Sequence, residues 1–241
     1  MNVFYQLGDL LFSRVCQSCG ATLSVDNAGR GSLCPDCAAL VTPVAFPYCS
    51  VCGDPVSGAV TSGYVCTACR TSRPAYDWAR SAVRYRGPAG DCLRSLKYDR
   101  GLWNLDTIES WLAALWPLLP PEAATADAIL PVPLYPRRWR QRTFNQSVLI
   151  AARLSRVSGI PLRRLRLLRS RPTLSQTRLN ARQRILNVRH AFFVPFPRLV
   201  RGRRFLLVDD VMTTGATLDS CARALKSAGA TAVYVVTAAR A

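Results

Sequence analysis

The chain has 241 residues, 49% of them hydrophobic, which is enough for one domain with an appendage or for two small domains. Its most apolar run, residues 111–119, is short and is bounded by prolines, so the sequence predicts no membrane span. The first thirteen residues carry an acid, Asp9, and no basic start, so we expect no signal peptide and a cytoplasmic protein.

The formal net charge is +18, and the charge is unevenly distributed along the chain. Residues 128–208 contain 19 arginines and no aspartate or glutamate. Arginine outnumbers lysine 30 to 2 in the whole sequence; a GC-rich genome explains that ratio, but it does not explain the missing acids. We therefore expect a partner that is a polyanion or a substrate with several phosphates.

Eight of the ten cysteines lie in four Cys-x2-Cys knuckles between residues 16 and 69. Because no secretion signal precedes them, we expect reduced thiolates in place of disulfides. Four sulfurs suit tetrahedral Zn²⁺ in a structural role, so the segment predicts one or two structural zinc sites. Pairing the knuckles in order is simplest, although an interleaved pairing stays open. The ordered pairing groups Cys16, Cys19, Cys34 and Cys37 in one site and Cys49, Cys52, Cys66 and Cys69 in the other.

Downstream of the cysteines the pattern changes to alternating strands and helices. We expect a strand at residues 79–85, a helix at 89–97, and a second helix at 104–115 that prolines close. A strand at 127–134 and a helix at 146–156 follow, joined by a loop that is rich in arginine. The arginines of this loop are Arg137, Arg138, Arg140 and Arg142.

The C-terminal part continues the alternation. Residues 162–168 and 191–194 are expected to be strands, and the polar, basic stretch between them is expected to be a mobile lid or an ordinary solvated connection. Strands at 205–208 and 232–237 flank a helix at 218–227. This order predicts an α/β fold, with a largely parallel sheet and helices on both faces.

The loop after the strand at 205–208 is suited to a sugar phosphate. Backbone N–H groups at a helix start lack intrahelical partners and favour an anion, and Gly215 allows close approach. Asp209 and Asp210 suit the hydroxyls of a sugar, so the pattern predicts ribose 5-phosphate; a helix cap or a magnesium site is the alternative. The candidate residues are Asp209, Asp210, Val211, Met212, Thr213, Thr214, Gly215, Ala216 and Thr217.

A diphosphate group is expected beside this loop. In an open parallel sheet, ligands lie beyond the carboxyl ends of the strands, so the arginine loop can face the same ligand. The planar guanidinium group suits a diphosphate, and we assign Arg137, Arg138, Arg140 and Arg142 to it, through Mg²⁺. Lys97, at a helix end, is either a solvated side chain or a further phosphate contact.

Residues 205–217 resemble the phosphoribosyl-diphosphate (PRPP) signature of type I phosphoribosyltransferases at every position. The chain as a whole resembles the ComF family, in the cysteine knuckles and in the stretches 95–98, 131–134, 142–146, 176–187 and 208–217. Thr143 stands where that family usually has glycine, and this departure weakens the diphosphate assignment of the neighbouring arginines.

The family resemblance implies a type I phosphoribosyltransferase-like domain at residues 76–241, preceded by a cysteine-rich zinc module at residues 1–75. It implies PRPP binding, and it links the chain to single-stranded DNA, to natural transformation and to other competence proteins. Because the fold includes members that transfer nothing, enzymatic activity stays open. The alternatives are a nucleobase-salvage transferase that releases pyrophosphate from PRPP, and a zinc adaptor with a vestigial site.

Overall fold

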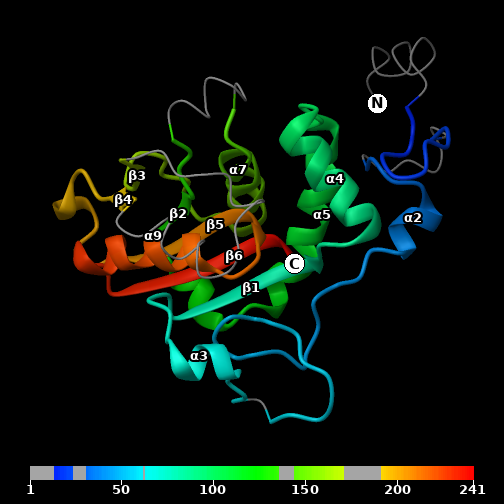
Figure 1. Ribbon diagram of the computed structural model, residues 1–241. Helices are drawn as coiled ribbons and strands as arrows, with labels where there is room; N and C mark the ends of the chain where they lie inside the picture. The colour runs from blue at the N-terminus through cyan, green and yellow to red at the C-terminus, as the bar shows by residue number, and fades with distance from the viewer. Residues whose placement is uncertain (1–13, 24–30, 62, 136–143, 171–190) are drawn as a thin grey trace.

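The computed structural model describes residues 14–23, 31–61, 63–135, 144–170 and 191–241. A four-stranded parallel sheet in the order β1-β6-β5-β2 forms its centre (Figure 1). The strands are β1 (Trp78–Arg84), β2 (Ala128–Pro131), β5 (Arg204–Met212) and β6 (Ala232–Arg240). The parallel sheet that the sequence predicts is thus confirmed.

Helices cover both faces of this sheet, as the alternating pattern indicates. Successive residues of β5 point to opposite faces: Phe205 and Leu207 join the core under α9, whereas Leu206 and Val208 join the core on the other side. Because β5 is buried on both faces, its sequence is a continuous apolar run and does not alternate. The helices are α9 (Ala216–Ser227) on the first face and α4 (Gly87–Tyr98), α5 (Leu105–Leu115) and α7 (Gln146–Ser158) on the second.

Short elements complete the described part of the chain. β3 and β4 form a separate antiparallel pair in which Leu168 lies opposite Phe193. No helix among the described residues has the length and apolar character that crossing a membrane requires. The short elements are α2 (Pro35–Ala39), α3 (Thr67–Thr71), β3 (Leu168–Arg169), β4 (Phe192–Phe193) and the 3₁₀ turns Leu102–Asn104, Trp116–Leu118, Pro121–Thr125 and Pro197–Leu199.

The predicted strand at residues 162–168 is wrong. Leu162 makes one parallel bridge to Ile129 of β2, and the chain then bends until it reaches the two-residue β3. The three residues after this bridge, Arg163, Arg164 and Leu165, are all exposed, so they offer no apolar face that a sheet would bury. The alternation of arginine and leucine is typical of a strand, but here it lies in a bent segment on the surface.

β5 is longer than the sequence indicates. Its ladder with β6 continues through Asp209, opposite Thr237, to Met212, opposite Arg240. The two acids therefore lie on the last part of the strand and not in the loop after it. This position fixes their backbone, because the ladder holds the neighbouring peptide groups.

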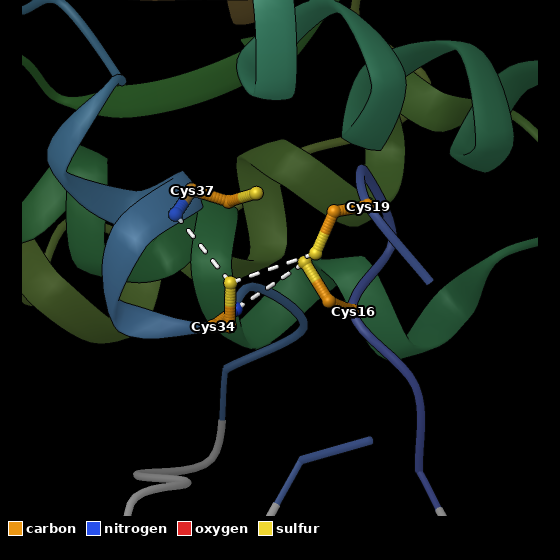
Figure 2. A group of neighbouring side chains, drawn as sticks. All are labelled: Cys16, Cys19, Cys34 and Cys37. Carbon is orange, nitrogen blue, oxygen red and sulfur yellow. Dashed lines mark hydrogen bonds between the residues drawn. The ribbon is translucent and has the colours of Figure 1, made fainter. Parts of the chain in front are cut away.

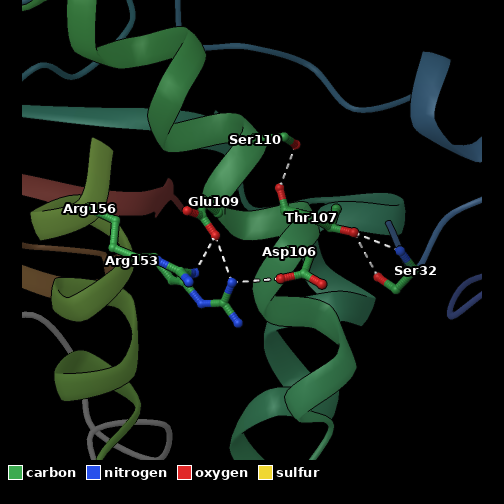
Figure 3. A network of polar contacts seen from close by, with 7 residues as sticks. All are labelled: Ser32, Asp106, Thr107, Glu109, Ser110, Arg153 and Arg156. Carbon is green, nitrogen blue, oxygen red and sulfur yellow. Dashed lines mark hydrogen bonds and ion pairs between the residues drawn. The ribbon is translucent and has the colours of Figure 1, made fainter. Parts of the chain in front are cut away.

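The first cysteine segment packs on α4 and α5. Ser18 Oγ donates to Asp91 Oδ2 at 2.7 Å, and Ser32 N donates to Thr107 Oγ1 at 2.8 Å (Figure 3). The two cysteines outside the knuckles, Cys92 and Cys221, are fully buried.

Figure 3 also shows how α5 is held against α7. Arg153 Nη1 lies 2.6 Å from Asp106 Oδ1 and 2.6 Å from Glu109 Oε2, and Arg156 Nη2 lies 2.6 Å from the same glutamate oxygen. Each arginine faces a carboxylate, so neither helix carries an unpaired charge at this contact. These ion pairs fix the position of α7, and the N-terminus of α7 lies at the end of β5.

The second cysteine segment packs against β1. Ala79 N donates to Val51 O at 2.7 Å, and the Arg80 guanidinium lies 4.5 Å from the centre of the Tyr48 ring. Cys49, with 0% of its surface exposed, belongs to the same hydrophobic core as α9 and β5. A division of the chain between residues 75 and 76 stays a prediction, but this segment shares its apolar core with the sheet.

Candidate ligand crevice and metal sites

The eight knuckle cysteines form two groups of four in the ordered pairing. Within each group the sulfur atoms all lie within 4.8 Å of one another. Figure 2 shows the first group, whose four side chains point toward one another. Cys19 Sγ lies 3.7 Å from Cys34 Sγ, and Cys52 Sγ lies 3.8 Å from Cys66 Sγ. A tetrahedron with a Zn–S length of about 2.3 Å has edges of about 3.8 Å, so both groups fit a structural zinc ion.

Backbone N–H groups favour the thiolate form of one sulfur in each group, Cys16 in the first and Cys49 in the second. Cys66 N donates to Cys49 Sγ at 3.3 Å, and Cys34 N donates to Cys16 Sγ at 3.3 Å. Burial raises the pKa of Cys49, but hydrogen bonds from backbone amides outweigh it and lower the pKa to about 7. A thiolate is the form that binds metal, so the fold prepares the sulfur for it.

The turn at Gly53 ties the second cysteine group to the sheet. Gly53 has a φ of +66°, and a Cβ at this position would lie 2.5 Å from the carbonyl oxygen of Ala79 in β1. Only glycine allows this close approach, as the position of a glycine directly after Cys52 suggests. The second metal group is therefore held directly against β1.

Asp209 lies at the carboxyl end of β5 and faces the start of α7. Its Oδ1 accepts from Ser147 Oγ at 2.7 Å and from the backbone N of Asp210 at 3.0 Å. Burial, and then the neighbouring charge of Asp210, raise the pKa of Asp209 from 3.8 to about 7. This carboxyl group therefore changes its charge close to neutral pH.

Asp210 faces α4. Its Oδ2 lies 3.3 Å from Lys97 Nζ, and its Oδ1 accepts from Val211 N at 2.7 Å. The Lys97 side chain is 28% exposed and that of Asp210 is 13% exposed, so the pair is half-buried. The structure thus places Lys97 beside the two acids. The sequence alone allowed either a solvated side chain or a phosphate contact at this position.

Asn145 joins β2 to α7 beside the acids. Its Nδ2 donates to Val132 O at 3.0 Å, and its Oδ1 accepts from Ser147 N at 3.0 Å and so caps α7. The hydroxyl group of Ser147 then reaches Asp209. No local pattern assigns a role to Ser147, because its partner lies 62 residues away along the chain.

The loop between β5 and α9 has the geometry of an anion site. Gly215 is the N-cap of α9 and has a φ of +75°. The space that a Cβ would take at Gly215 is occupied by Met212 Cε and the Tyr76 hydroxyl. A Cβ there would lie 2.8 Å from Met212 Cε, so a side chain would strain the loop. The N–H groups of the first turn of α9 have no intrahelical acceptors and lie at the positive end of the helix.

Arg240, at the end of β6, holds this loop from behind. Its side chain is 9% exposed; Nη1 donates to the carbonyl oxygens of Met212, at 3.2 Å, and of Thr213. In a trans peptide the C=O and the following N–H point in opposite directions, so the N–H of Thr214 points away from Arg240. On its other side, Nε donates to Asp54 Oδ1 at 3.0 Å, next to the second metal group.

A cavity of about 1330 Å³ adjoins the loop. It runs from Thr214 and Gly215 along α9, past Arg223, to Phe193 and Pro197. One wall of this cavity is the second cysteine segment, through Cys52 and Cys66 among others. The cavity thus links the anion loop to the segment at β4.

The predicted site residues fall into two sets. Lys97 and the stretch from Asp209 to Thr217 converge at the carboxyl ends of β5 and β2. Arg137, Arg138, Arg140 and Arg142 lie outside the described residues, as do Thr143 and the expected lid at residues 171–190. The sequence reasoning missed Arg240 and Asp54. The only sequence feature that could have indicated Arg240 is its place as a charged residue at the end of an apolar strand.

The chain matches the double zinc ribbon domain over residues 7–72 and the phosphoribosyl transferase domain over residues 145–241. It is 31% identical to Competence protein F of Haemophilus influenzae, over 95% of this chain and 98% of that protein. It is 32% identical to the DNA utilization protein YhgH of Escherichia coli, over 92% and 94% of the two chains. It is 25% identical to Competence protein ComFC of Bacillus subtilis, over 93% of each chain.

Proposed function

Because the chain belongs to the ComF family, we propose that it binds PRPP in the crevice at the carboxyl end of β5 and acts on single-stranded DNA during competence. The acid pair accepts hydrogen bonds from the ribose hydroxyls. The amides and hydroxyls of residues 213–217 bind the 5-phosphate. The diphosphate, with Mg²⁺, lies toward Lys97 and the loop at residues 137–142.

One observation carries this proposal: two carboxylates on a rigid strand lie beside a helix N-terminus and a lysine. A phosphate alone does not need the acids, because carboxylates repel it. A sugar diol alone does not need the helix N-terminus. A ligand that has a diol next to a phosphate uses both parts, and a further phosphate uses the ammonium group of Lys97. The phosphoribosyl transferase match and the names of the relatives support the same ligand and the same process.

Calorimetric titration of the zinc-loaded protein with PRPP and Mg²⁺ tests the proposal. We expect one binding site in the wild type and an affinity about tenfold to a hundredfold lower in Asp210→Asn, because a charge-assisted hydrogen bond is lost. Asp127→Asn is the matched control: Asp127 accepts from Arg204 N at the opposite end of β5, and its replacement should leave the affinity unchanged. No heat with the wild type, as for a vestigial site, would contradict the proposal.

The same titration, repeated across neutral pH, has a predicted direction. The pKa of Asp209 is about 7. The ionised carboxylate only accepts hydrogen bonds and so suits the sugar hydroxyls, whereas the protonated acid is itself a hydrogen-bond donor. The ligand therefore favours the ionised form, and affinity should rise about tenfold between about pH 6 and pH 8. PRPP also titrates, so Asp209→Asn gives the baseline. A wild-type slope equal to that baseline would exclude direct contact with Asp209.

Added nucleobases separate this function from salvage. A salvage enzyme releases pyrophosphate from PRPP only when its base is present. We expect no such dependence on a free base, because the proposed partner is a polymer. Base-dependent pyrophosphate release at enzymatic rates would favour the salvage reaction instead.

A further inference from the structure

A basic surface lies at the amino ends of β5 and β2, at the opposite end of the sheet from Asp210. Arg204 and Asp210 lie six residues apart on β5, so about 20 Å of strand separate this surface from Asp210. We define the arginine–phenylalanine surface by six side chains that come from the segments before β3, at β4 and before β5. They are Arg163, Arg166, Arg198, Arg203, Phe193 and Phe196.

Hydrogen bonds to backbone carbonyl groups bring these segments together. Arg166 Nη1 donates to Leu199 O at 2.9 Å, which joins the bent segment before β3 to the turn at Pro197–Leu199. Arg203 N donates to Val200 O at 3.1 Å, which folds the next residues back onto the same turn. These two hydrogen bonds hold the segments that carry Arg166, Arg198 and Arg203 next to one another.

The positive charge of this surface is not balanced locally. Among the described residues, no carboxylate forms an ion pair with Arg163, Arg166, Arg198 or Arg203. Burial, and then the charges of Arg203 and Arg163, lower the pKa of Arg166. Asp127, the acid at the start of β2, accepts from the backbone N of Arg204 at 2.8 Å. An anion with several charges would relieve this repulsion.

Two exposed aromatic rings lie among the arginines. Phe193 is 43% exposed and Phe196 is 52% exposed. Next to them, the Arg169 guanidinium lies over the Phe192 ring, 5.3 Å from its centre, so a cation and an aromatic ring already interact here. Positive charge that follows a backbone, combined with rings on which bases stack, is the combination that binds single strands.

The cavity gives this surface a path toward the anion loop. Phe193 and Pro197 line its outer end, and Thr214 and Gly215 line its inner end. A duplex has its bases stacked inside and would use the arginines alone. A membrane surface would leave the narrow path along α9 unused. A flexible single strand uses the arginines, the rings and the path together.

We propose that a single-stranded nucleic acid binds across the arginine–phenylalanine surface, with its phosphates on the arginines and its bases stacked on Phe193 and Phe196, and continues along the cavity toward the anion loop. This inference rests on the proposed function, because it names the surface through which the DNA partner acts. It assigns DNA and PRPP to separate sites on one chain.

Fluorescence anisotropy with labelled single-stranded oligonucleotides, at several salt concentrations, tests this assignment. The triple variant Arg163→Ala/Arg198→Ala/Arg203→Ala should bind more weakly, and its log–log salt slope should be smaller by about 2, because each phosphate contact contributes about 0.7. Phe193→Ala/Phe196→Ala should weaken binding about tenfold or more with an unchanged slope, because stacking releases no counterions. PRPP affinity should be unchanged in both.

A triple variant of exposed arginines elsewhere, Arg86→Ala/Arg94→Ala/Arg156→Ala, matches the change in net charge and is the control. An equal loss in this control would overturn the assignment, as would equally tight binding of duplex DNA or of anionic phospholipid vesicles. An RNA strand of the same sequence shows whether the protein distinguishes ribose from deoxyribose. Equal affinity for RNA and DNA supports recognition through phosphates and base stacking. If PRPP gives no heat while the DNA results hold, the proposed PRPP site fails and this surface stands.

Discussion

Replacing Cys49 with serine should abolish the folded state, whereas replacing Cys16 with serine should leave the sheet folded. The second metal group contributes Cys49, Cys52 and Cys69 to the hydrophobic core that β5 and α9 share. Structural zinc contributes about 10–16 kcal/mol in finger peptides, as much as the net stability of a typical domain, which is about 5–15 kcal/mol. Loss of this group therefore removes both the metal and part of the core.

The first metal group is attached to the surface of α4 and α5 instead. Its contacts to the helices are polar, such as Ser32 with Thr107, and Cys19 is exposed. We expect Cys16→Ser to bind one zinc ion per chain in place of two, and to keep a cooperative thermal transition with near-native far-UV circular dichroism. Equal thermal stability of the two variants would show that the second group is not part of the core.

Arg240→Met should weaken PRPP binding by about tenfold or more and lower thermal stability. The guanidinium group fixes the carbonyl oxygens of Met212 and Thr213, and its loss frees the peptide groups that aim the loop amides. It also leaves Asp54 without its partner beside the second metal group. We expect the zinc content to stay at two ions per chain, so the defect would be one of loop position.

Arg223→Met is the matched control for this variant. Arg223 pairs with Asp219 on the exposed side of α9, and its side chain is 58% exposed, so its loss should change little. Asp54→Asn keeps an oxygen that accepts from Arg240 and should have an intermediate effect. If Arg240→Met binds PRPP as tightly as Arg223→Met does, the loop does not depend on this contact.

Local patterns predicted the parts of the fold that local chemistry decides. The apolar run at residues 205–208, the cysteine spacing, and the helix that follows the glycine loop each reflect neighbouring residues. Each is found in the structure, although the helix begins at Ala216, two residues before the predicted start. The bent segment after Leu162 shows the limit of this reasoning, because arginine and leucine alternate there without a buried face.

Long-range contacts explain what the sequence alone could not give. Arg240 reaches Asp54, which lies 186 residues earlier in the chain, and Ser147 reaches Asp209 across 62 residues. No spacing rule relates such pairs, since they depend on the strand order and on the docking of the second cysteine segment. The shifted pKa of Asp209 has the same origin, because its burial arises only in the folded sheet.

Hydrogen exchange of the zinc-loaded protein, with and without PRPP and Mg²⁺, tests the central claim most directly. The account predicts slower exchange in peptides that cover residues 209–218 and the start of α7, and unchanged exchange at residues 198–204. Protection that is absent from residues 209–218, or that falls at residues 198–204 instead, would contradict a PRPP crevice at the carboxyl end of β5.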